Sequence, residues 1–348
     1  MKMQQLSSSI SSHIPRFLNR LKEVEVHSVS SDTYVQQYLE HLLEHAGYYV
    51  KIYARVLEMG ISSSGKEKEN IDLLDYGAGV GLLGIFASFC GFKKVSINDK
   101  EPAFLSAALV LSKHFNINNI EFISGGLESG FEYQKWGKPD LLVATDVIEH
   151  IYDLDEFLFC CKQWNINMSM VLTTGSNPAN RRKVLLLRKL QKRDEWEGNP
   201  IDNGNKLAGY EHEAFRSMRK KIILEYAPSM TPEHLEMLTE RTRGLIRKDI
   251  QEKVLRFVTK GEMPEAPVDP YNTCHPETGS WSERILSFEE YESIFKKHDL
   301  LVQFIPGFYN SDKKGLKKIL VNATNLLLPI FGMKMAPFIF IRAQNIHR

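Results

Sequence analysis

The sequence has 348 residues, of which 43% are hydrophobic and 25% are charged, and its formal net charge is +1. These values are ordinary for a globular protein that buries a sizeable core. The near-zero charge excludes a protein whose overall field draws it to nucleic acid or an anionic membrane, so such a partner would have to bind a local patch. The four cysteines form no Cys-x-x-Cys pair, which excludes a zinc framework or disulfide scaffold and fits a reducing compartment.

Neither end of the chain carries the pattern of a secretory or membrane-spanning segment. The N-terminus has no apolar core, so we expect no secretory signal. Residues 319–340 are apolar but are interrupted by Asn322, Pro329, Gly332 and Lys334, whereas a spanning helix needs about 20 mostly apolar residues. We therefore expect a buried helix followed by a buried strand in this segment, and a cytoplasmic protein with no membrane span.

Apolar residues at helical spacing follow Asp32 and predict a long helix from this N-cap to Gly60, with a polar linker at residues 62–69. Short apolar runs then alternate with helical patterns. This alternation predicts an α/β fold with a doubly wound, Rossmann-like, mostly parallel seven-stranded sheet. The expected strands are residues 71–76, 94–98, 120–124, 141–145, 168–174, 301–305 and 337–342; the expected helices are 82–90, 102–115, 154–164, a helix capped by Ser287, and 316–328.

Residues 179–284 differ from the rest, because they are charged and carry no strand pattern. Thr231 and Pro232 predict a helix that runs to Lys260, before Gly261. We therefore expect three parts, which are an N-terminal helical segment and linker (1–70), a Rossmann-like core (71–178 and 285–345) and a helical insertion (179–284) that forms a lid or acceptor site.

A glycine-rich turn follows the first expected strand, with the sequence Asp-Tyr-Gly-Ala-Gly-Val-Gly at residues 75–81. Glycines let the backbone approach a ligand closely at the start of a helix. Residues 79–84 also fit the dinucleotide pattern G-x-G-x-x-G, and either cofactor would use Asp99 for a ribose diol. The carboxylate of Asp75 favours a positively charged sulfonium and ammonium over a pyrophosphate. An NAD-dependent oxidoreductase is therefore the less favoured alternative.

Three motifs in order resemble those of class I S-adenosylmethionine-dependent methyltransferases. They are the turn at residues 75–81, Asp99 as the second-strand acid, and Asp-Val-Ile-Glu-His-Ile at residues 146–151. The resemblance implies that the cofactor is S-adenosylmethionine and that Asp75 belongs to its site. It further implies contacts of Gly77, Gly79 and Gly81 with the methionine part, of Asp99 with the ribose, of Gly126 and Leu127 near the adenine, and of Thr145 and Asp146 near the amino end.

Three histidines are the candidate catalytic residues. His150 follows the fourth strand, where an imidazole could act as general base for an acceptor hydroxyl; alternatively it caps the next helix or packs beneath the cofactor. His212 and His275 lie in polar segments of the insertion and could instead be surface residues. Asp146, Glu149 and His150 resemble the acid cluster of ubiquinone-biosynthesis O-methyltransferases and of small-RNA 2′-O-methyltransferases. That resemblance implies a possible Mg²⁺ or other divalent cation, while the metal ligands stay unknown.

The basic residues at 181–193 are expected to form a solvated face, and the alternative is a binding site for an anionic acceptor such as a nucleotide-linked sugar or RNA. The leucines of this segment are expected to form one buried face. No aromatic residues alternate with the Arg and Lys residues, as stacking on RNA would require, so we expect no nucleic acid partner. The expected acceptor is small or medium-sized, such as a hydroxyl of a sugar or secondary metabolite. RNA or nitrogen acceptors and a catalytically silent cofactor-binding partner are alternatives, and the oligomeric state stays open.

Overall fold

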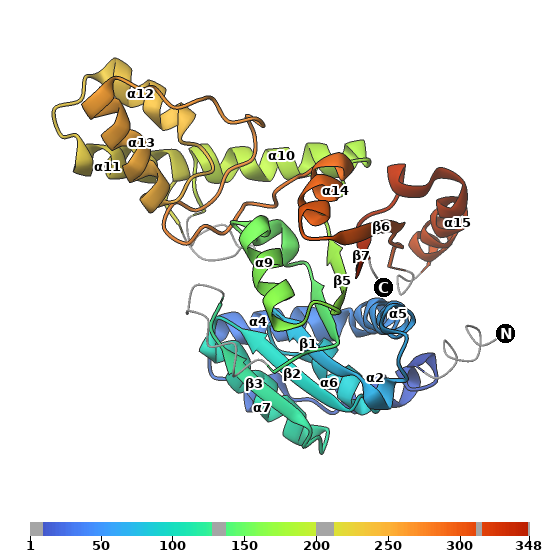
Figure 1. Ribbon diagram of the computed structural model, residues 1–348. Coiled ribbons are helices and arrows are strands. Elements are labelled where there is room, and N and C mark those ends of the chain that lie inside the picture. Colours follow the sequence, from blue (N-terminus) through green and yellow to red (C-terminus); the bar gives the residue numbers. More distant parts are fainter. Residues whose placement is uncertain (1–9, 127–136, 200–211, 311–314, 347–348) are drawn as a thin grey trace. The chain divides into compact units, whose positions relative to one another are not determined.

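A computed structural model describes residues 10–126, 137–199, 212–310 and 315–346 (Figure 1). The chain divides into two compact units. The first, here called the sheet unit, comprises Met1–Ile148, Leu154–Thr174 and Phe288–Arg348. The second, called the helical unit, comprises Glu149–Asp153 and Gly175–Ser287.

The sheet unit is built on a mixed sheet that has seven strands in the described residues, in the order β3-β2-β1-β4-β5-β7-β6. Strands β1 to β5 pair in parallel, whereas β7 is antiparallel to both β5 and β6. This order is typical of the Rossmann-like fold of class I methyltransferases and confirms the predicted fold class. The strands are β1 (Asp72–Tyr76), β2 (Lys94–Asp99), β3 (Ile120–Ser124), β4 (Leu141–Thr145), β5 (Ser169–Thr174), β6 (Leu300–Pro306) and β7 (Ile339–Asn345).

The central strands are buried on both faces, with Leu73, Leu141 and Val171 each at most 1% exposed. Burial on both faces produces the continuous apolar runs from which these strands were predicted. Helices connect the strands, and among the described residues none is both long and apolar enough to cross a membrane. They are α6 (Leu82–Phe89), α7 (Pro102–His114), α9 (Leu154–Trp164), α14 (Phe288–Lys297) and α15 (Leu316–Phe331), with the 3-10 turns η3 (Ile148–His150) and η4 (Gly332–Lys334).

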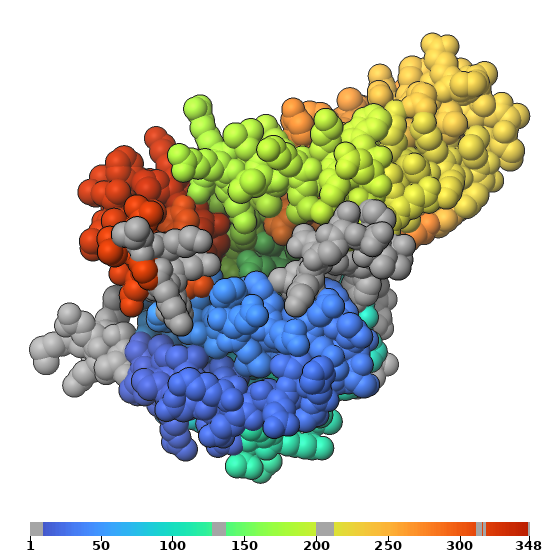
Figure 2. Space-filling view, turned by 180° about the vertical axis from the view of Figure 1, so that it is seen from behind, coloured from blue at the N-terminus to red at the C-terminus, as the bar shows by residue number. Residues whose placement is uncertain are grey.

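Helices near the N-terminus add a layer to the sheet unit, seen in blue in Figure 2, and α5 packs on β4, β5 and β7. Asp32 caps α4 as predicted, because its Oδ1 accepts the Val35 N–H at 3.0 Å. The single helix predicted from Asp32 is nevertheless two helices. The elements are α2 (Ile14–Leu21), α3 (Val26–Val29), α4 (Thr33–Glu44), α5 (Ala46–Ser64) and the 3-10 turn η1 (Lys68–Asn70).

The predicted end of this helix at Gly60 is wrong. Helix α5 passes through Gly60 and ends at Gly65, whose φ is +63°. A Cβ at Gly60 would lie 2.3 Å from Leu141 Cδ2, so this glycine permits close packing on β4. Part of the predicted linker is consequently helical, and Ser63 is buried where Arg342 Nε donates to its hydroxyl at 2.6 Å.

The helical unit contains a small apolar core between helices that follow one another along the chain. Thr231 caps one helix and Gly261 ends another, as predicted. The single helix predicted between them is wrong, because the chain breaks near Gly244, where φ is +76° and the Trp281 ring lies 2.8 Å from a virtual Cβ. The helices are α10 (Arg181–Trp196), α11 (Phe215–Tyr226), α12 (Pro232–Arg241) and α13 (Arg247–Lys260).

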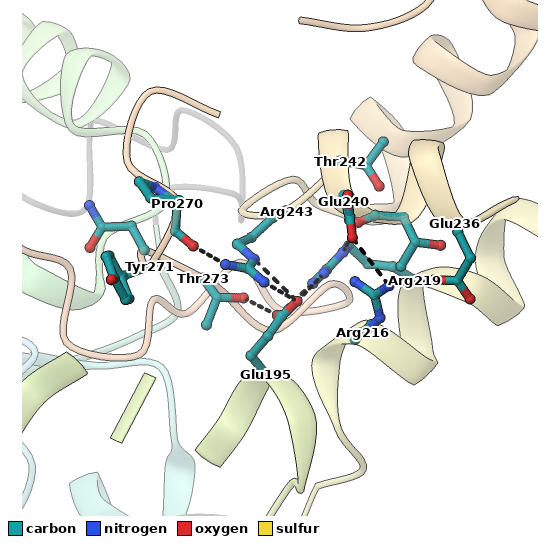
Figure 3. Close-up of polar contacts among 12 residues, drawn as sticks. Glu195, Arg216, Arg219, Glu236, Glu240, Thr242, Arg243, Pro270, Tyr271 and Thr273 are labelled. Atoms are coloured by element: carbon teal, nitrogen blue, oxygen red, sulfur yellow. Dashed lines mark hydrogen bonds and ion pairs between the residues drawn. The ribbon is translucent and has the colours of Figure 1, made fainter. Parts of the chain in front are cut away.

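A buried ionic network joins α10 and α11 to Arg243 and Thr273, which lie in loops of the same unit (Figure 3). The guanidinium of Arg219, which is fully buried, donates to both carboxylate oxygens of Glu195, at 3.0 and 2.5 Å. Arg243 Nη2 lies 3.1 Å from Glu195, and the Thr273 hydroxyl donates to it at 2.8 Å. Burial alone would raise the pKa of Glu195, but its bonds to Arg219 and the charge of Arg243 outweigh burial and lower it. Glu195 is therefore ionised in the folded protein.

Two predicted buried faces are wrong. On α10, Leu185 and Leu186 are each 62% exposed, so the leucines there do not form one buried side. On α15, which was predicted as a buried helix, Ile319, Leu326 and Ile330 are 66%, 77% and 74% exposed. The strand that follows α15 is buried as predicted.

Candidate functional site

The glycine-rich turn lies between β1 and α6, and its backbone requires glycine. Gly77, Gly79 and Gly81 have left-handed φ angles of +63°, +54° and +72°. Residues with a Cβ are strained in this region. Gly81 is the N-cap of α6, so the turn leads directly into the first turn of that helix, where backbone N–H groups are available to a ligand.

Two buried carboxylates flank the turn. Asp75, at 2% exposure, accepts the Gly84 N–H at 2.8 Å. Burial raises the pKa of Asp75 to about 7, although the Gly84 bond acts in the opposite direction. Asp99, at the end of β2, accepts the Gly79 N–H through Oδ2 at 2.8 Å and the Glu101 N–H through Oδ1 at 2.9 Å. Burial also raises the pKa of Asp99, and its carboxylate ties β2 to the turn.

The other predicted cofactor residues lie where neighbouring strands end. Thr145 is the last residue of β4 and is half-buried. Asp146 follows it, is exposed, has a φ of +55° and donates its N–H to the Thr173 carbonyl at 3.1 Å. Gly126 follows β3 and is half-buried, whereas Leu127 lies outside the described residues. Parallel strands bring their carboxyl ends to one edge of a sheet, so the described members of this set share that edge.

Sequence reasoning missed a group of aromatic hydroxyls at the same edge. We call it the tyrosine cluster; its members are Tyr34, Tyr38, Tyr48, Tyr49 and Tyr53 of α4 and α5. Burial raises the pKa of every member, and the charge of Asp146 raises four of them further. For Tyr49 the pKa rises to about 12. The remaining member, Tyr34, is raised by burial and then by the charge of Asp99. The feature of the sequence that could have indicated this cluster is the high density of tyrosines in residues 34–53.

Tyr38 of the tyrosine cluster packs directly against the glycine turn. A Cβ on Gly79 would lie 3.1–3.3 Å from three atoms of the Tyr38 ring and hydroxyl. A Cβ on Gly77 would lie 2.8 Å from Val147 Cγ2. The glycines are therefore needed for space as well as for backbone conformation, and α4 forms a wall over the turn.

His150 belongs to the helical unit, where a backbone group orients its ring. Its Nδ1 lies 2.8 Å from the Trp281 carbonyl oxygen. Because a carbonyl only accepts, Nδ1 carries a proton, and in the neutral ring the lone pair is then on Nε2. The neighbouring Glu149 accepts the Gly175 N–H at 3.0 Å, and the Arg284 N–H donates to its carbonyl at 3.1 Å. These hydrogen bonds join Glu149 and His150 to Gly175, Trp281 and Arg284 of the same unit.

The structure brings the other two candidate histidines together within the helical unit. The ring of His212 stacks on Phe215, with centroids 4.5 Å apart, and lies 6.2 Å from the ring of His275. His275 Nδ1 accepts the backbone N–H groups of Glu277 and Thr278 at 3.2 and 3.3 Å. Its proton in the neutral ring is therefore on Nε2.

The residues of the suggested metal cluster are divided between the two units. Asp146 belongs to the sheet unit, and Glu149 and His150 belong to the helical unit. Across the described ranges, no group of three or more His, Cys, Asp or Glu side chains is placed to hold a metal ion. Both Glu149 and His150 also contact backbone groups, so a metal ion at this cluster stays a prediction from the resemblance.

Comparison with protein-family models finds no match for the chain. The solved structures that this chain matches resemble it only weakly, with low TM-scores and low sequence identity. PKMT2 from Rickettsia typhi, which has also been solved in complex with AdoHcy, has a TM-score of 0.41 and 15% identity over 84% of this chain and 52% of its own. An S-adenosylmethionine dependent methyltransferase from Mesorhizobium loti has a TM-score of 0.40 and 11% identity over 83% and 98%. Precorrin-6y C5,15-methyltransferase from Geobacter metallireducens has a TM-score of 0.31 and 16% identity over 40% and 69%. The chain spans about half the length of the Rickettsia protein, and none of these values says what this chain binds or methylates.

Proposed function

We propose that the protein transfers a methyl group from S-adenosylmethionine to a hydroxyl of a small or medium-sized acceptor. The observation that carries the proposal is the junction between the glycine turn and Asp99, where the Gly79 N–H donates to the carboxylate at 2.8 Å. This junction lies at the carboxyl edge of the sheet, where doubly wound folds bind their ligands. Helix α4 covers it with Tyr38.

The residues at this edge fit the cofactor, whose sulfonium supplies a methyl group on a good leaving group. Gly77, Gly79 and Gly81 would hold the methionine part against bare backbone. Asp99 retains capacity for ribose hydroxyls, because each carboxylate oxygen can accept two hydrogen bonds and each has one backbone donor. Asp75, whose pKa is about 7 in the ligand-free chain, adds negative charge in its ionised form. A nearby sulfonium or ammonium would favour that form, and the same charge would repel a pyrophosphate.

The remaining chemistry is to position the acceptor and to remove its proton. We assign His150 as the base: its Nε2 lone pair would take the proton from the acceptor hydroxyl. Its Nδ1–H donates to the Trp281 carbonyl and thereby fixes the orientation of the ring. His212 and His275, which lie together, are assigned to the wall of the acceptor site in residues 179–284. Thr145, Asp146 and Gly126 complete the cofactor side at the ends of β4 and β3.

The resemblance to ubiquinone-biosynthesis O-methyltransferases supports a narrower proposal, in which Asp146, Glu149 and His150 hold Mg²⁺. A divalent cation there would acidify and orient the acceptor hydroxyl. We expect methyl transfer to fall in excess EDTA and to return with added Mg²⁺. Full activity in EDTA would end the metal proposal and leave the methyl donor unaffected.

Calorimetric titration tests the cofactor. We expect S-adenosylhomocysteine to bind and to raise the unfolding temperature, because a ligand of the folded state stabilises it, and we expect NAD to do neither. Stabilisation by NAD alone would overturn the proposal. Transfer of a labelled methyl group to a panel of sugars, phenols, amines and RNA then tests the acceptor. Binding without any transfer across that panel would favour a catalytically silent partner.

A further inference from the structure

Helix α15 of the sheet unit presents an apolar stripe to solvent. Six large side chains, which we call the α15 stripe, are exposed: Ile319 (66%), Leu320 (68%), Leu326 (77%), Leu327 (41%), Ile330 (74%) and Phe331 (50%). At 100° per residue these positions fall within one arc of about 140° around the helix axis. The end of the chain that carries α15 lies on the molecular surface, in red in Figure 2.

Polar contacts fix which side of α15 faces the protein. Asn325 Oδ1 accepts the Tyr309 N–H at 2.8 Å, and its Nδ2 donates to the Tyr309 carbonyl at 3.0 Å. The Tyr309 hydroxyl donates to the Met335 carbonyl at 2.7 Å. Leu328, on the same side as Asn325, is 7% exposed. The helix therefore turns Asn325 and Leu328 inward and the six side chains of the α15 stripe outward, whereas an ordinary surface helix turns its apolar stripe toward the core.

The sequence around α15 is positively charged. From Lys313 to the last residue there is no Asp or Glu. Two lysines near the ends of the helix, Lys318 and Lys334, are exposed. The basic residues of the segment are Lys313, Lys314, Lys317, Lys318, Lys334, Arg342 and Arg348. The segment is thus basic in sequence, on a chain whose total charge is +1, and Lys318 and Lys334 are its exposed cations among the residues whose side chains the structure describes.

We propose that α15 docks the protein on the surface of an anionic bilayer, with the helix in the plane of the interface and the α15 stripe in the acyl boundary. Interfacial helices combine an apolar face with basic residues that attract anionic lipid headgroups. The helix has 16 residues, which is short for a span. A second copy docked on the same helix would bring Lys318 and Lys334 of both chains to one interface, and like charges oppose such contact. The proposal does not depend on the reaction at the cofactor site.

Vesicle co-sedimentation of the full chain tests this surface. We expect binding to phosphatidylcholine vesicles that contain phosphatidylserine, weaker binding to phosphatidylcholine alone, and loss of binding at high salt. The double variant Leu326→Asp/Ile330→Asp should bind about tenfold more weakly or worse, because it places two charges in the α15 stripe. The variant Lys318→Glu/Lys334→Glu should weaken binding only to the phosphatidylserine vesicles.

The matched control is Leu255→Asp/Val258→Asp on α13, which also puts two acids at exposed apolar positions of a helix, 44% and 56% exposed. It should bind vesicles as the wild type does. Unfolding temperature and S-adenosylhomocysteine titration show that each variant is folded. No binding of the wild type to phosphatidylserine vesicles would overturn the proposal. So would a dimer, seen by light scattering, that the α15 variant alone abolishes, because the stripe would then be an interface between copies.

Discussion

The carboxylate of Asp99 accepts the backbone N–H of Gly79 at 2.8 Å, and thereby joins the end of β2 to the glycine turn after β1. Its other oxygen accepts the Glu101 N–H at 2.9 Å. Asp99 thus shapes the turn before any ligand is present. A residue predicted from the sequence as a ribose contact is also a structural part of the site.

Replacing Asp99 should therefore weaken cofactor binding by two routes. Asp99→Asn keeps one acceptor oxygen but sets an amide against the second backbone N–H, and Asp99→Ala loses both bonds. Hydrogen bonds to a charged group contribute about 1.5–3 kcal/mol, so we expect roughly 10- to 100-fold weaker S-adenosylhomocysteine binding for Asn and a larger loss for Ala. Calorimetric titration measures both. Equal affinities in the two variants would show that the backbone bonds do not matter.

The variant Gly79→Ala tests whether crowding by Tyr38 adds to the cost of a left-handed backbone at this position. The new Cβ would lie 3.1–3.3 Å from Tyr38, at a residue whose φ is +54°. Gly65→Ala is the matched control, because its φ is +63° and no heavy atom of the described chain lies within 4 Å of the added Cβ. The left-handed conformation costs about 1–2 kcal/mol in either variant. We expect the Gly79 variant to lose more stability than this in urea unfolding, and to lose cofactor affinity, whereas the control keeps its affinity.

Asp75 should make the stability of the ligand-free protein depend on pH. Its pKa is about 7 in the folded chain, against about 3.9 when unfolded, so the folded state binds the proton more tightly. The resulting stabilisation is complete below about pH 4 and is lost as the pH rises through 7. Its size is on the order of 4 kcal/mol, since one pKa unit corresponds to about 1.36 kcal/mol.

The matched variant is Asp75→Asn, whose amide oxygen can still accept the Gly84 N–H but does not titrate. We expect its free energy of unfolding to change less between pH 5 and 8 than that of the wild type. The measurement is urea unfolding across this range. Parallel pH curves for the two proteins would show that Asp75 is ionised throughout.

The buried network of the helical unit should be sensitive to loss of one partner. Glu195→Gln removes the charge that Arg219 and Arg243 face, and breaking a buried pair costs about 3–5 kcal/mol. The control is Glu252→Gln, in the pair with Arg256 where both side chains are 54% exposed, and we expect a loss of at most about 1 kcal/mol. Because the pKa of Glu195 is lowered on folding, its contribution holds above the unfolded value and disappears as the pH falls through the folded one. Hydrogen exchange of α11 reports the local loss; equal effects of the two variants would contradict it.

The sequence allowed the sheet and the turn to be predicted because both leave local patterns. The bounds of β3 and β4 were predicted to the residue, because Asn119 and Gly125 flank β3 and Asp140 and Asp146 flank β4. The ends of helices were predicted less well. Gly60 resembles a helix stop in the sequence, but its lack of a side chain serves the contact with Leu141, which only the tertiary structure reveals.

The tyrosine cluster was missed, and α15 was wrongly predicted as buried, for a related reason. Apolar periodicity predicts Tyr38 and Tyr49 on the apolar side of one helix, whereas they lie on α4 and α5. A helix side that faces the core and one that faces a site also give the same pattern. The same holds for α15, where the pattern shows an apolar stripe and cannot show that it faces solvent. In that helix the deciding contact is between Asn325 and the backbone of Tyr309, which lie apart in the sequence.

His150 can be tested as the base without disturbing the ring's anchor. In His150→Asn the side-chain amide can still donate to the Trp281 carbonyl, which His150 Nδ1 contacts at 2.8 Å, but it offers no basic nitrogen. A general base contributes about 100- to 10,000-fold to rate. We therefore expect methyl transfer to fall by at least about 100-fold in this variant while S-adenosylhomocysteine affinity is unchanged. The control within the same unit is His234→Asn on α12, whose ring packs on Phe257. Transfer that stays near the wild-type rate excludes the base, and a parallel loss of cofactor affinity would show instead that His150 packs beneath the cofactor.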